Sequence, residues 1–191
     1  MNKITVMRIV EWLISQDVIR EEDRNLYHYA LNNLLHAVLP IFLSLMVGII
    51  LRCPARAIVI IIPFVVLRRF CGGFHMKNAW VCMFSSTVLL VDFVLLSFLI
   101  HNLEIVFFCA AFSGVSLLLL SPVENENKPL SPGEKARCKA ITEYVVSILF
   151  LLLTVLYCFR VKEVLICAAL GIMLPAVLQY PVFIEKVFTD T

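Results

Sequence analysis

Long apolar stretches alternate with short polar connections through most of this chain. A membrane-spanning helix needs about 20 mostly apolar residues. Six segments are candidates for such helices, and they cover residues 34–51, 53–67, 79–100, 105–120, 140–159 and 164–184. The second segment is the weakest, because Arg56 leaves only 57–67 uninterrupted. The longest connection, 121–139, is polar and contains two Ser-Pro pairs, so we expect a loop there.

Residues 1–33 have a different pattern. Val6, Val10 and Leu13 recur at helical spacing among charged residues, with Trp12 beside them. This pattern favours a helix lying in the headgroup region of a bilayer, or a short cytoplasmic helix packing on the bundle. The charges that continue through residues 20–24 argue against a signal peptide. We predict an all-α polytopic membrane protein, with an N-terminal amphipathic segment (1–33) and a domain of six transmembrane helices (34–191).

The composition supports this class. Of the 191 residues, 61% are hydrophobic and 16% are charged, against roughly 45–50% and about 25% in soluble domains. A water-soluble globule of this size could not bury that much apolar surface. These values exclude a soluble enzyme, a disordered chain and a secreted disulfide scaffold, so the main surroundings are a lipid bilayer. The net charge of +2 is too balanced to indicate nucleic-acid binding.

The placement of Lys and Arg predicts the orientation of the segments. If all six segments span the membrane, the side that holds the N-terminus carries 12 Lys and Arg residues and the opposite side carries 4. Cytoplasmic loops carry the excess of positive charge. We therefore expect a multi-pass membrane protein, with both termini and the segments 68–78 and 121–139 cytoplasmic.

The densest polar cluster covers residues 68–78 and continues to Cys82 at the start of the third apolar segment. Cys82 lies near a predicted helix N-terminus, where the helix dipole favours a thiolate. His75 is the histidine nearest to it in sequence, and histidine is the usual base that activates such a thiol. Positive charge that favours the thiolate, and that can also hold an acidic peptide, comes from Arg68, Arg69 and Lys77.

Geometry limits how His75 and Cys82 can meet. Seven residues of straight helix would separate them by about 10.5 Å along the axis. A general base must come within about 3 Å of the atom that it deprotonates. We therefore predict that the chain turns at Gly72 and Gly73, since glycine tolerates unusual backbone angles. This turn would fold His75 back over the start of the third segment.

Other interpretations of these residues stay open. Cys82 is alternatively a packing residue, and the seven scattered cysteines contain no CxxC pair. Cys71, His75 and Cys82 could be three metal ligands, but no fourth lies nearby, so we expect no metal and no cofactor. Asp92, one charge deep in an apolar segment, is a candidate functional residue or a helix–helix hydrogen-bonding residue. We interpret His36, near the start of the first segment, as structural.

A second polar cluster covers residues 121–130. Its prolines favour an extended path, and its Asn and Glu side chains offer hydrogen-bond donors and acceptors. Such a segment could bind a peptide backbone, or it could be a solvated connector. The candidate supporting residues are Glu124, Asn127 and Lys128.

The two clusters together resemble the accessory gene regulator B family of bacterial membrane peptidases. The resemblance rests on the stretch Arg-Arg-Phe-Cys-Gly-Gly-Phe-His-Met-Lys at 68–77, on Cys82 seven positions after His75, and on the 121–130 segment. It covers most of the chain from about Tyr27 onward. Arg68 and Gly73 correspond to motif positions of the family.

The resemblance implies a cysteine endopeptidase that processes a small, membrane-associated propeptide of a quorum-sensing system. Cys82 would be the nucleophile and His75 the general base. The enzyme would remove an acidic C-terminal tail and leave an acyl-enzyme thioester, which a cysteine within the substrate converts into a cyclic thiolactone. A homodimer is one assembly open to so small a bundle. The alternatives are a non-catalytic carrier or exporter with Asp92 and His36 on a polar path, and a sensor that binds a peptide without cutting it.

Overall fold

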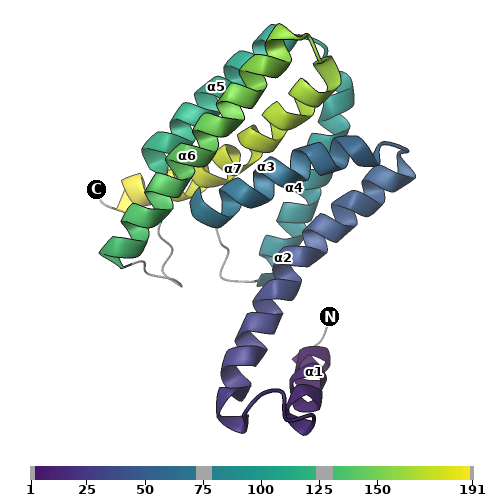
Figure 1. Ribbon diagram of the computed structural model, residues 1–191, viewed down its shortest axis with the longest axis vertical. Coiled ribbons are helices and arrows are strands. Elements are labelled where there is room, and N and C mark those ends of the chain that lie inside the picture. The colour runs from purple at the N-terminus through teal and green to yellow at the C-terminus, as the bar shows by residue number, and fades with distance from the viewer. Residues whose placement is uncertain (1–2, 72–78, 124–130, 190–191) are drawn as a thin grey trace.

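The computed structural model describes residues 3–71, 79–123 and 131–189, and this part of the chain consists of helices joined by short connections (Figure 1). Within these ranges, the side chains at 3–5, 33, 36–37, 79–83 and 181–189 are not described. The helices are α1 (Lys3–Ser15), α2 (Arg24–Ile50), α3 (Pro54–Cys71), α4 (Ala79–Leu99), α5 (Leu103–Leu120), α6 (Pro132–Cys158) and α7 (Lys162–Thr189), with a 3-10 turn η1 (Glu21–Asp23) before α2. The all-α prediction is confirmed for these residues.

Each of the six apolar segments coincides with one helix from α2 to α7. Two helices start earlier than the hydropathy suggests. α2 begins at Arg24, ten residues before the apolar segment that starts at 34. α6 begins at Pro132, so the prediction of a loop over the whole of 121–139 was wrong for its last eight residues.

The early start of α6 has a local cause. Ser131 is the N-cap of the helix, and its hydroxyl accepts a hydrogen bond from the Glu134 backbone N–H at 3.4 Å. The Glu134 carboxylate in turn accepts from the Ser131 N–H at 3.0 Å, which completes a capping box. Pro132 fits the first helical turn, where its missing N–H costs no hydrogen bond. These contacts start the helix before its apolar part begins.

α7 is the central helix of the bundle and packs against α3, α4, α5 and α6. Its residues 165–172 are buried almost without interruption, including Leu165, Ala169 and Leu170, which have no exposed surface. Gly171 permits a close approach to α3, because a Cβ atom at this position would lie 2.6 Å from the Ile60 carbonyl oxygen. The core therefore forms around the last helix of the chain.

The outer faces of the bundle are apolar. α5 turns Phe108, Phe112 and Leu119 outward, with 70%, 71% and 78% of each residue exposed. A soluble monomer rarely exposes apolar patches of this extent. In the described part, three helices are long and apolar enough to cross a membrane by length and composition, and these are Leu103–Leu120, Pro132–Cys158 and Lys162–Tyr180. The shorter apolar helices are Val38–Ile50 and Phe84–Leu99.

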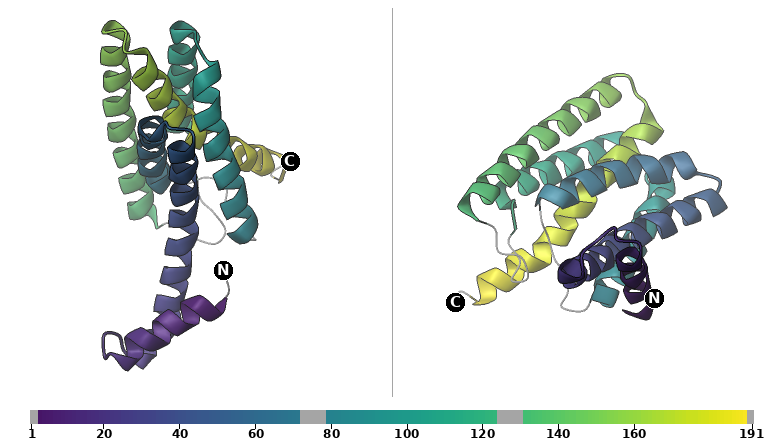
Figure 2. Two further views of the ribbon diagram at one scale, coloured as in Figure 1. Left: turned by 90° about the vertical axis from the view of Figure 1, so that its right-hand side faces the viewer. Right: turned by 60° about the horizontal axis from the view of Figure 1, so that its bottom comes forward.

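The helices from α2 to α7 alternate in direction. In Figure 1 the turns that join α4 to α5 and α6 to α7 lie at the top, and the turn that joins α2 to α3 lies at the right. The end of α3, the start of α4, the end of α5 and the start of α6 lie near mid-height, above α1 and the start of α2. From the side, the turns α4–α5 and α6–α7 are again at the top, and α3 is seen nearly end-on at mid-height (Figure 2). The two polar clusters of the sequence therefore connect helix ends on one side of the bundle.

α1 packs against the N-terminal half of α2 and lies apart from the main bundle (Figures 1 and 2). Val6 and Val10 are buried with Ile19 in a small separate core, against which Leu31 and Leu35 of α2 pack. The side chain of Trp12 is 61% exposed. One face of α1 therefore packs against α2. The other face carries the exposed Trp12 ring, which is suited to a bilayer surface.

Candidate functional site

The candidate site is built where α3 ends and α4 begins. Arg68 and Arg69 lie in the last turn of α3, where positive charge complements the carbonyl end of the helix dipole. Arg69 is exposed and its guanidinium lies 5.9 Å from the centre of the Phe70 ring. Cys82 lies in α4, close to Ala79, where the described part of that helix starts. Basic groups and the cysteine backbone therefore lie at neighbouring helix ends on one side of the bundle (Figure 1).

The remaining predicted site residues lie outside the described residues. They are Gly73, His75, Lys77, Glu124, Asn127 and Lys128. Of Cys82 the structure describes the helical backbone and not the side chain. The predicted contact between His75 and Cys82 therefore stays a prediction, as does the turn at Gly72 and Gly73.

Both polar clusters begin from one buried polar junction, formed by Cys71, Ser121, Val123, Thr142 and Gln179, which we call the Gln179 junction. The Gln179 side-chain nitrogen donates to the Cys71 carbonyl oxygen at 3.0 Å and to the Ser121 hydroxyl at 2.9 Å. The same Cys71 carbonyl accepts from the Val123 N–H at 3.0 Å. The Cys71 thiol lies 3.7 Å from the Thr142 hydroxyl. Four helices, α3, α5, α6 and α7, are thus joined at this point.

Cys71 is the other thiol of the cluster, and its surroundings are unsuited to catalysis. It has no exposed surface, and its carbonyl and thiol both contact side chains of the Gln179 junction. A substrate carbonyl carbon could not approach a sulfur atom enclosed in this way. Among the described residues, no three His, Cys, Asp or Glu side chains form a metal site. The described contacts of Cys71 are therefore those of a packed residue.

Asp92 lies on the outer face of α4 between Val88 and Leu96, and its carboxylate forms no hydrogen bond or ion pair with another described residue. The alternative in which it hydrogen-bonds to a neighbouring helix of the same chain is therefore not supported by the described contacts. The side chain of His36 is not among those described. No contact among the described residues therefore supports the polar path that the carrier alternative requires.

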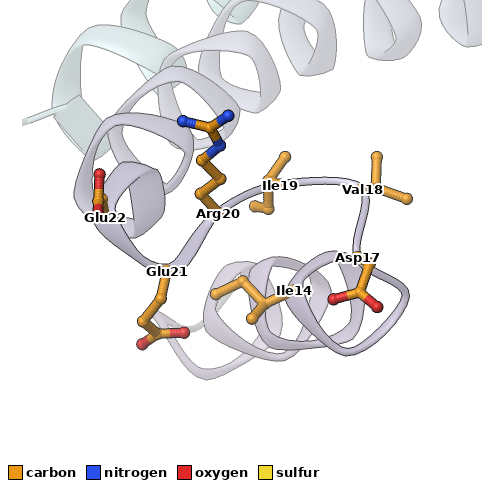
Figure 3. Close-up of a pocket in the computed structure, with 7 residues that line it drawn as sticks. All are labelled: Ile14, Asp17, Val18, Ile19, Arg20, Glu21 and Glu22. Carbon is orange, nitrogen blue, oxygen red and sulfur yellow. The ribbon is translucent and has the colours of Figure 1, made fainter.

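One hollow of the described surface lies elsewhere. It has a volume of about 510 Å³ and is formed at the turn between α1 and α2 (Figure 3). Its lining residues are Ile14, Asp17, Val18, Ile19, Arg20, Glu21 and Glu22. All of them belong to one continuous turn, and none is a nucleophile or an imidazole. We assign no chemistry to this hollow.

Sequence analysis missed Gln179 and underrated Arg56. Gln179 is an isolated amide in an apolar stretch, and polar residues in such stretches are usually structural or functional contacts. Arg56 was treated as an interruption of the second apolar segment. It instead forms an ion pair with Glu163 at 2.9 Å and lies 4.4 Å from the centre of the Phe98 ring. In both cases the signal was a lone polar residue among apolar ones.

The apolar outer faces, the alternating helices and the polar ends on one side define a helical membrane protein. The sequence model of the family described as Accessory gene regulator B matches residues 6–180, and the chain belongs to this family. A curated relative, the accessory gene regulator protein B of Staphylococcus saprophyticus, is 25% identical over 129 residues, which cover 65% of this chain and 65% of the relative. The alignment thus leaves about a third of the relative's length unmatched. No solved structure matches the chain significantly.

Proposed function

We propose that this chain is a membrane-embedded cysteine endopeptidase of a quorum-sensing system, with Cys82 as nucleophile and His75 as general base. The observation that carries the proposal is that the basic last turn of α3, with Arg68 and Arg69, is joined to the described start of α4, with Cys82, by the segment that contains His75. Nearby positive charge favours a thiolate over a thiol. Membership of the Accessory gene regulator B family supports the substrate class, a propeptide of that regulatory system.

The proposed reaction has two acyl-transfer steps. The Cys82 thiolate attacks the carbonyl carbon of the scissile peptide bond and forms a C–S bond. The C–N bond then breaks, and the departing amine of the C-terminal tail takes the proton from the His75 imidazolium. In the second step, a cysteine thiol of the propeptide gives its proton to His75 and attacks the thioester. The bond to Cys82 breaks, so that a cyclic thiolactone forms and the Cys82 thiolate is regenerated.

The second step needs a site from which water is kept out. Exchange of one thioester for another is close to thermoneutral, so hydrolysis of the acyl-enzyme would win if water had free access. A thiol at the boundary of the bilayer is suited to excluding water. Holding the substrate thiol near the acyl carbon replaces a bimolecular attack, and effective molarities of about 10⁵ M or more are reached in such geometries.

Substrate recognition is assigned to the polar residues around the two helix ends. Arg68 and Arg69, in the last turn of α3, are suited to hold the acidic tail of the propeptide. Gly73 and Lys77 would support this contact. Glu124, Asn127 and Lys128 would bind the peptide backbone of the substrate. The partners of the chain would then be the propeptide, with its internal cysteine and acidic tail, and the lipid bilayer, with a second copy as a further candidate.

We also propose that α2 to α7 each cross the plasma membrane, with both termini and the active site on the cytoplasmic side. The alternating direction of the six helices supports this topology. The excess of Lys and Arg on one side supports the orientation. Arg68 and Arg69 lie on the side that would face the cytoplasm.

Co-expression of the chain with its cognate propeptide tests the proposal. Cys82→Ala and His75→Ala should abolish the cleaved and cyclised products, and Cys82→Ser should be much slower because a serine hydroxyl is hardly ionised near neutral pH. Cys109→Ala and His101→Ala are matched controls. Both residues are exposed, and neither lies near the end of α3 or the start of α4. Processing that survives in both Cys82→Ala and His75→Ala would contradict the peptidase proposal. Transport that depends on Asp92 and not on Cys82 would instead favour the carrier alternative.

A further inference from the structure

We propose that the outer face of α4 is the surface through which two copies of this chain associate in the membrane, with Asp92 of each copy facing Asp92 of the other. This role rests on the proposed topology, in which α4 spans the bilayer, and not on the peptidase chemistry. The partner is a second copy that has the same orientation across the membrane.

α4 carries two rows of side chains on opposite sides of the helix. The row that is buried within the bundle consists of Leu90, Val94 and Ser97. The row on the other side is exposed and consists of Val88, Asp92, Leu95 and Leu99. In both rows successive residues are three or four positions apart, which is the spacing of a helix face that packs on another helix. The outer row therefore has the pattern of a packing surface but is exposed in the described part of the chain.

Asp92 is the polar member of the outer row, and it lies deep in the apolar part of α4. The helix ends at Leu99, seven residues later, so Asp92 is about 10 Å from that end along the axis. An aspartate side chain is too short to reach polar surroundings over this distance, whereas a lysine or an arginine near a helix end can do so. The Asp92 carboxylate forms no hydrogen bond or ion pair with another described residue. A single chain would thus present this group to lipid tails.

The carboxyl group distinguishes the outer row of α4 from the apolar rows on other helices. α5 also has an exposed row with the same spacing, formed by Phe108, Phe112, Val115 and Leu119. All of these side chains are apolar, so lipid tails can cover them without cost. Acidic residues in membrane-spanning segments instead almost always face protein or a water-filled cavity. The row around Asp92 is therefore the one that requires a protein partner.

A second copy of the chain supplies the hydrogen-bonding group that Asp92 lacks. In a two-fold dimer whose axis is normal to the membrane, the two α4 helices are parallel and the same residue of each lies at the same depth. A carboxyl group that keeps its proton donates a hydrogen bond to the carboxylate of the other copy, so the two groups share one proton. An unrelated helix would have to carry a donor at this depth, whereas a copy brings one by symmetry.

The apolar neighbours of Asp92 suit such a parallel pair. Val88 precedes Asp92 by four residues and Leu95 follows it by three. In a heptad this spacing places Asp92 at an a position, with Val88 and Leu95 at the d positions on either side. A single polar residue at an a position specifies the register and the number of associated helices. The apolar residues above and below would pack together and keep lipid and water away from the shared proton.

Energy transfer between labelled copies measures the association. Full-length chains with a donor or an acceptor dye on a C-terminal tag are mixed in lipid vesicles at increasing protein-to-lipid ratios. The wild type should dimerise, and Asp92→Leu should weaken the dimer roughly 3- to 20-fold, as expected for a hydrogen bond between membrane helices. Asp92→Asn should stay within about threefold of the wild type, because a carboxamide also donates and accepts. Phe112→Leu, on the outer row of α5, is the matched control and should leave the dimer unchanged.

Photo-crosslinking locates the interface without a change at Asp92. Benzoylphenylalanine is incorporated at the position of Leu95 in chains that carry two different affinity tags. Illumination of the membranes should give a product that contains both tags. The same probe at the position of Phe112 should give no such product above background, since that row faces lipid.

Three results would overturn the interface. They are a chain that is monomeric at all protein-to-lipid ratios, an Asp92→Leu dimer as tight as the wild type, and a crosslink from position 95 to an unrelated membrane protein alone. Neither readout uses the propeptide, so a monomeric chain that cleaves normally contradicts only the interface, and a dimeric chain that does not cleave contradicts only the peptidase function. Labelling of Asp92→Cys by a water-soluble maleimide, above the level of the unsubstituted chain, would contradict the spanning of α4 and the interface with it.

Discussion

Arg56 and Glu163 form an ion pair between the first turns of α3 and α7, with 2.9 Å between Nη2 and Oε1. The same guanidinium donates from Nη1 to the Ser97 carbonyl oxygen at 3.4 Å and lies 4.4 Å from the centre of the Phe98 ring, both on α4. One side chain thus joins three helices. These contacts lie at the end of the bundle opposite to the Gln179 junction, so they offer a test of the fold that is separate from the site.

Arg56→Met should lower the free energy of unfolding by about 1–2 kcal/mol, because it removes a cation–π contact and a hydrogen bond from a side chain that is only 22% exposed. Glu163→Gln should cost less than about 1 kcal/mol, since the Glu163 side chain is 73% exposed and its charge is screened by solvent. Unfolding in mixed detergent micelles measures both values. Equal losses from the two variants would show that the ion pair, and not the contacts with α4, is the main contribution of Arg56.

Gly171→Ala should destabilise the bundle by roughly 1–3 kcal/mol, the usual cost of overpacking a core. The added methyl group would meet the Ile60 carbonyl oxygen at 2.6 Å and the Pro63 ring at 3.1 Å, and neither can move without shifting α3. Gly133→Ala is the matched control, because a Cβ atom there meets nothing within 4 Å. The same unfolding titration compares them, and equal stability of the two variants would argue against the close packing of α3 on α7.

Ser131→Ala should cost about 1 kcal/mol, as the loss of an N-cap usually does. The variant removes the hydroxyl that accepts from the Glu134 N–H and donates to the Glu134 carboxylate at 2.7 Å. Ser147→Ala, also on α6, should have little effect, since the Ser147 hydroxyl only bonds back to the carbonyl one turn earlier. Hydrogen exchange of the amides at 133–137 provides a local measurement. Faster exchange there in Ser131→Ala, and not in Ser147→Ala, is the expected result.

Single cysteines introduced at His101 and at Arg137 should be labelled from opposite sides of the membrane. Both side chains are exposed, His101 at the turn between α4 and α5 and Arg137 near the start of α6. A membrane-impermeant maleimide added to intact cells should label His101→Cys above the level of the unsubstituted chain. Arg137→Cys should gain label only after the membrane is permeabilised. The reverse pattern would invert the proposed orientation.

The helices of this fold could be predicted from hydropathy, but their packing could not. Each apolar segment lies on its own helix, because a spanning length of apolar residues leaves little choice of structure. Hydropathy could not indicate that α7 is central. Lipid tails are as apolar as a protein interior, so a buried helix and a lipid-facing helix have the same composition. The start of α6 was predictable in principle, since Ser131 and Glu134 have capping-box spacing.

In the candidate site, only the residues whose own side-chain chemistry suggests a role could be predicted from the sequence. Cys82, His75 and the arginine pair Arg68 and Arg69 stand out by residue type and spacing alone. Gln179 has no such spacing relative to Cys71, which lies 108 residues earlier, and only the packing of α7 on α3 brings them together. A contact of that kind depends on tertiary structure and leaves no local pattern in the sequence.

The central position of α7 also affects the order in which the helices can pack during synthesis. Of the seven helices, α7 is the last to leave the ribosome, yet α3, α4, α5 and α6 all pack on it. Until it is inserted, the face of α3 around Ile60 and Pro63 and the Cys71 carbonyl oxygen lack their contacts with α7. The earlier helices must therefore wait as a loose assembly in the bilayer, and insertion of α7 both completes the bundle and delivers the amide that closes the Gln179 junction.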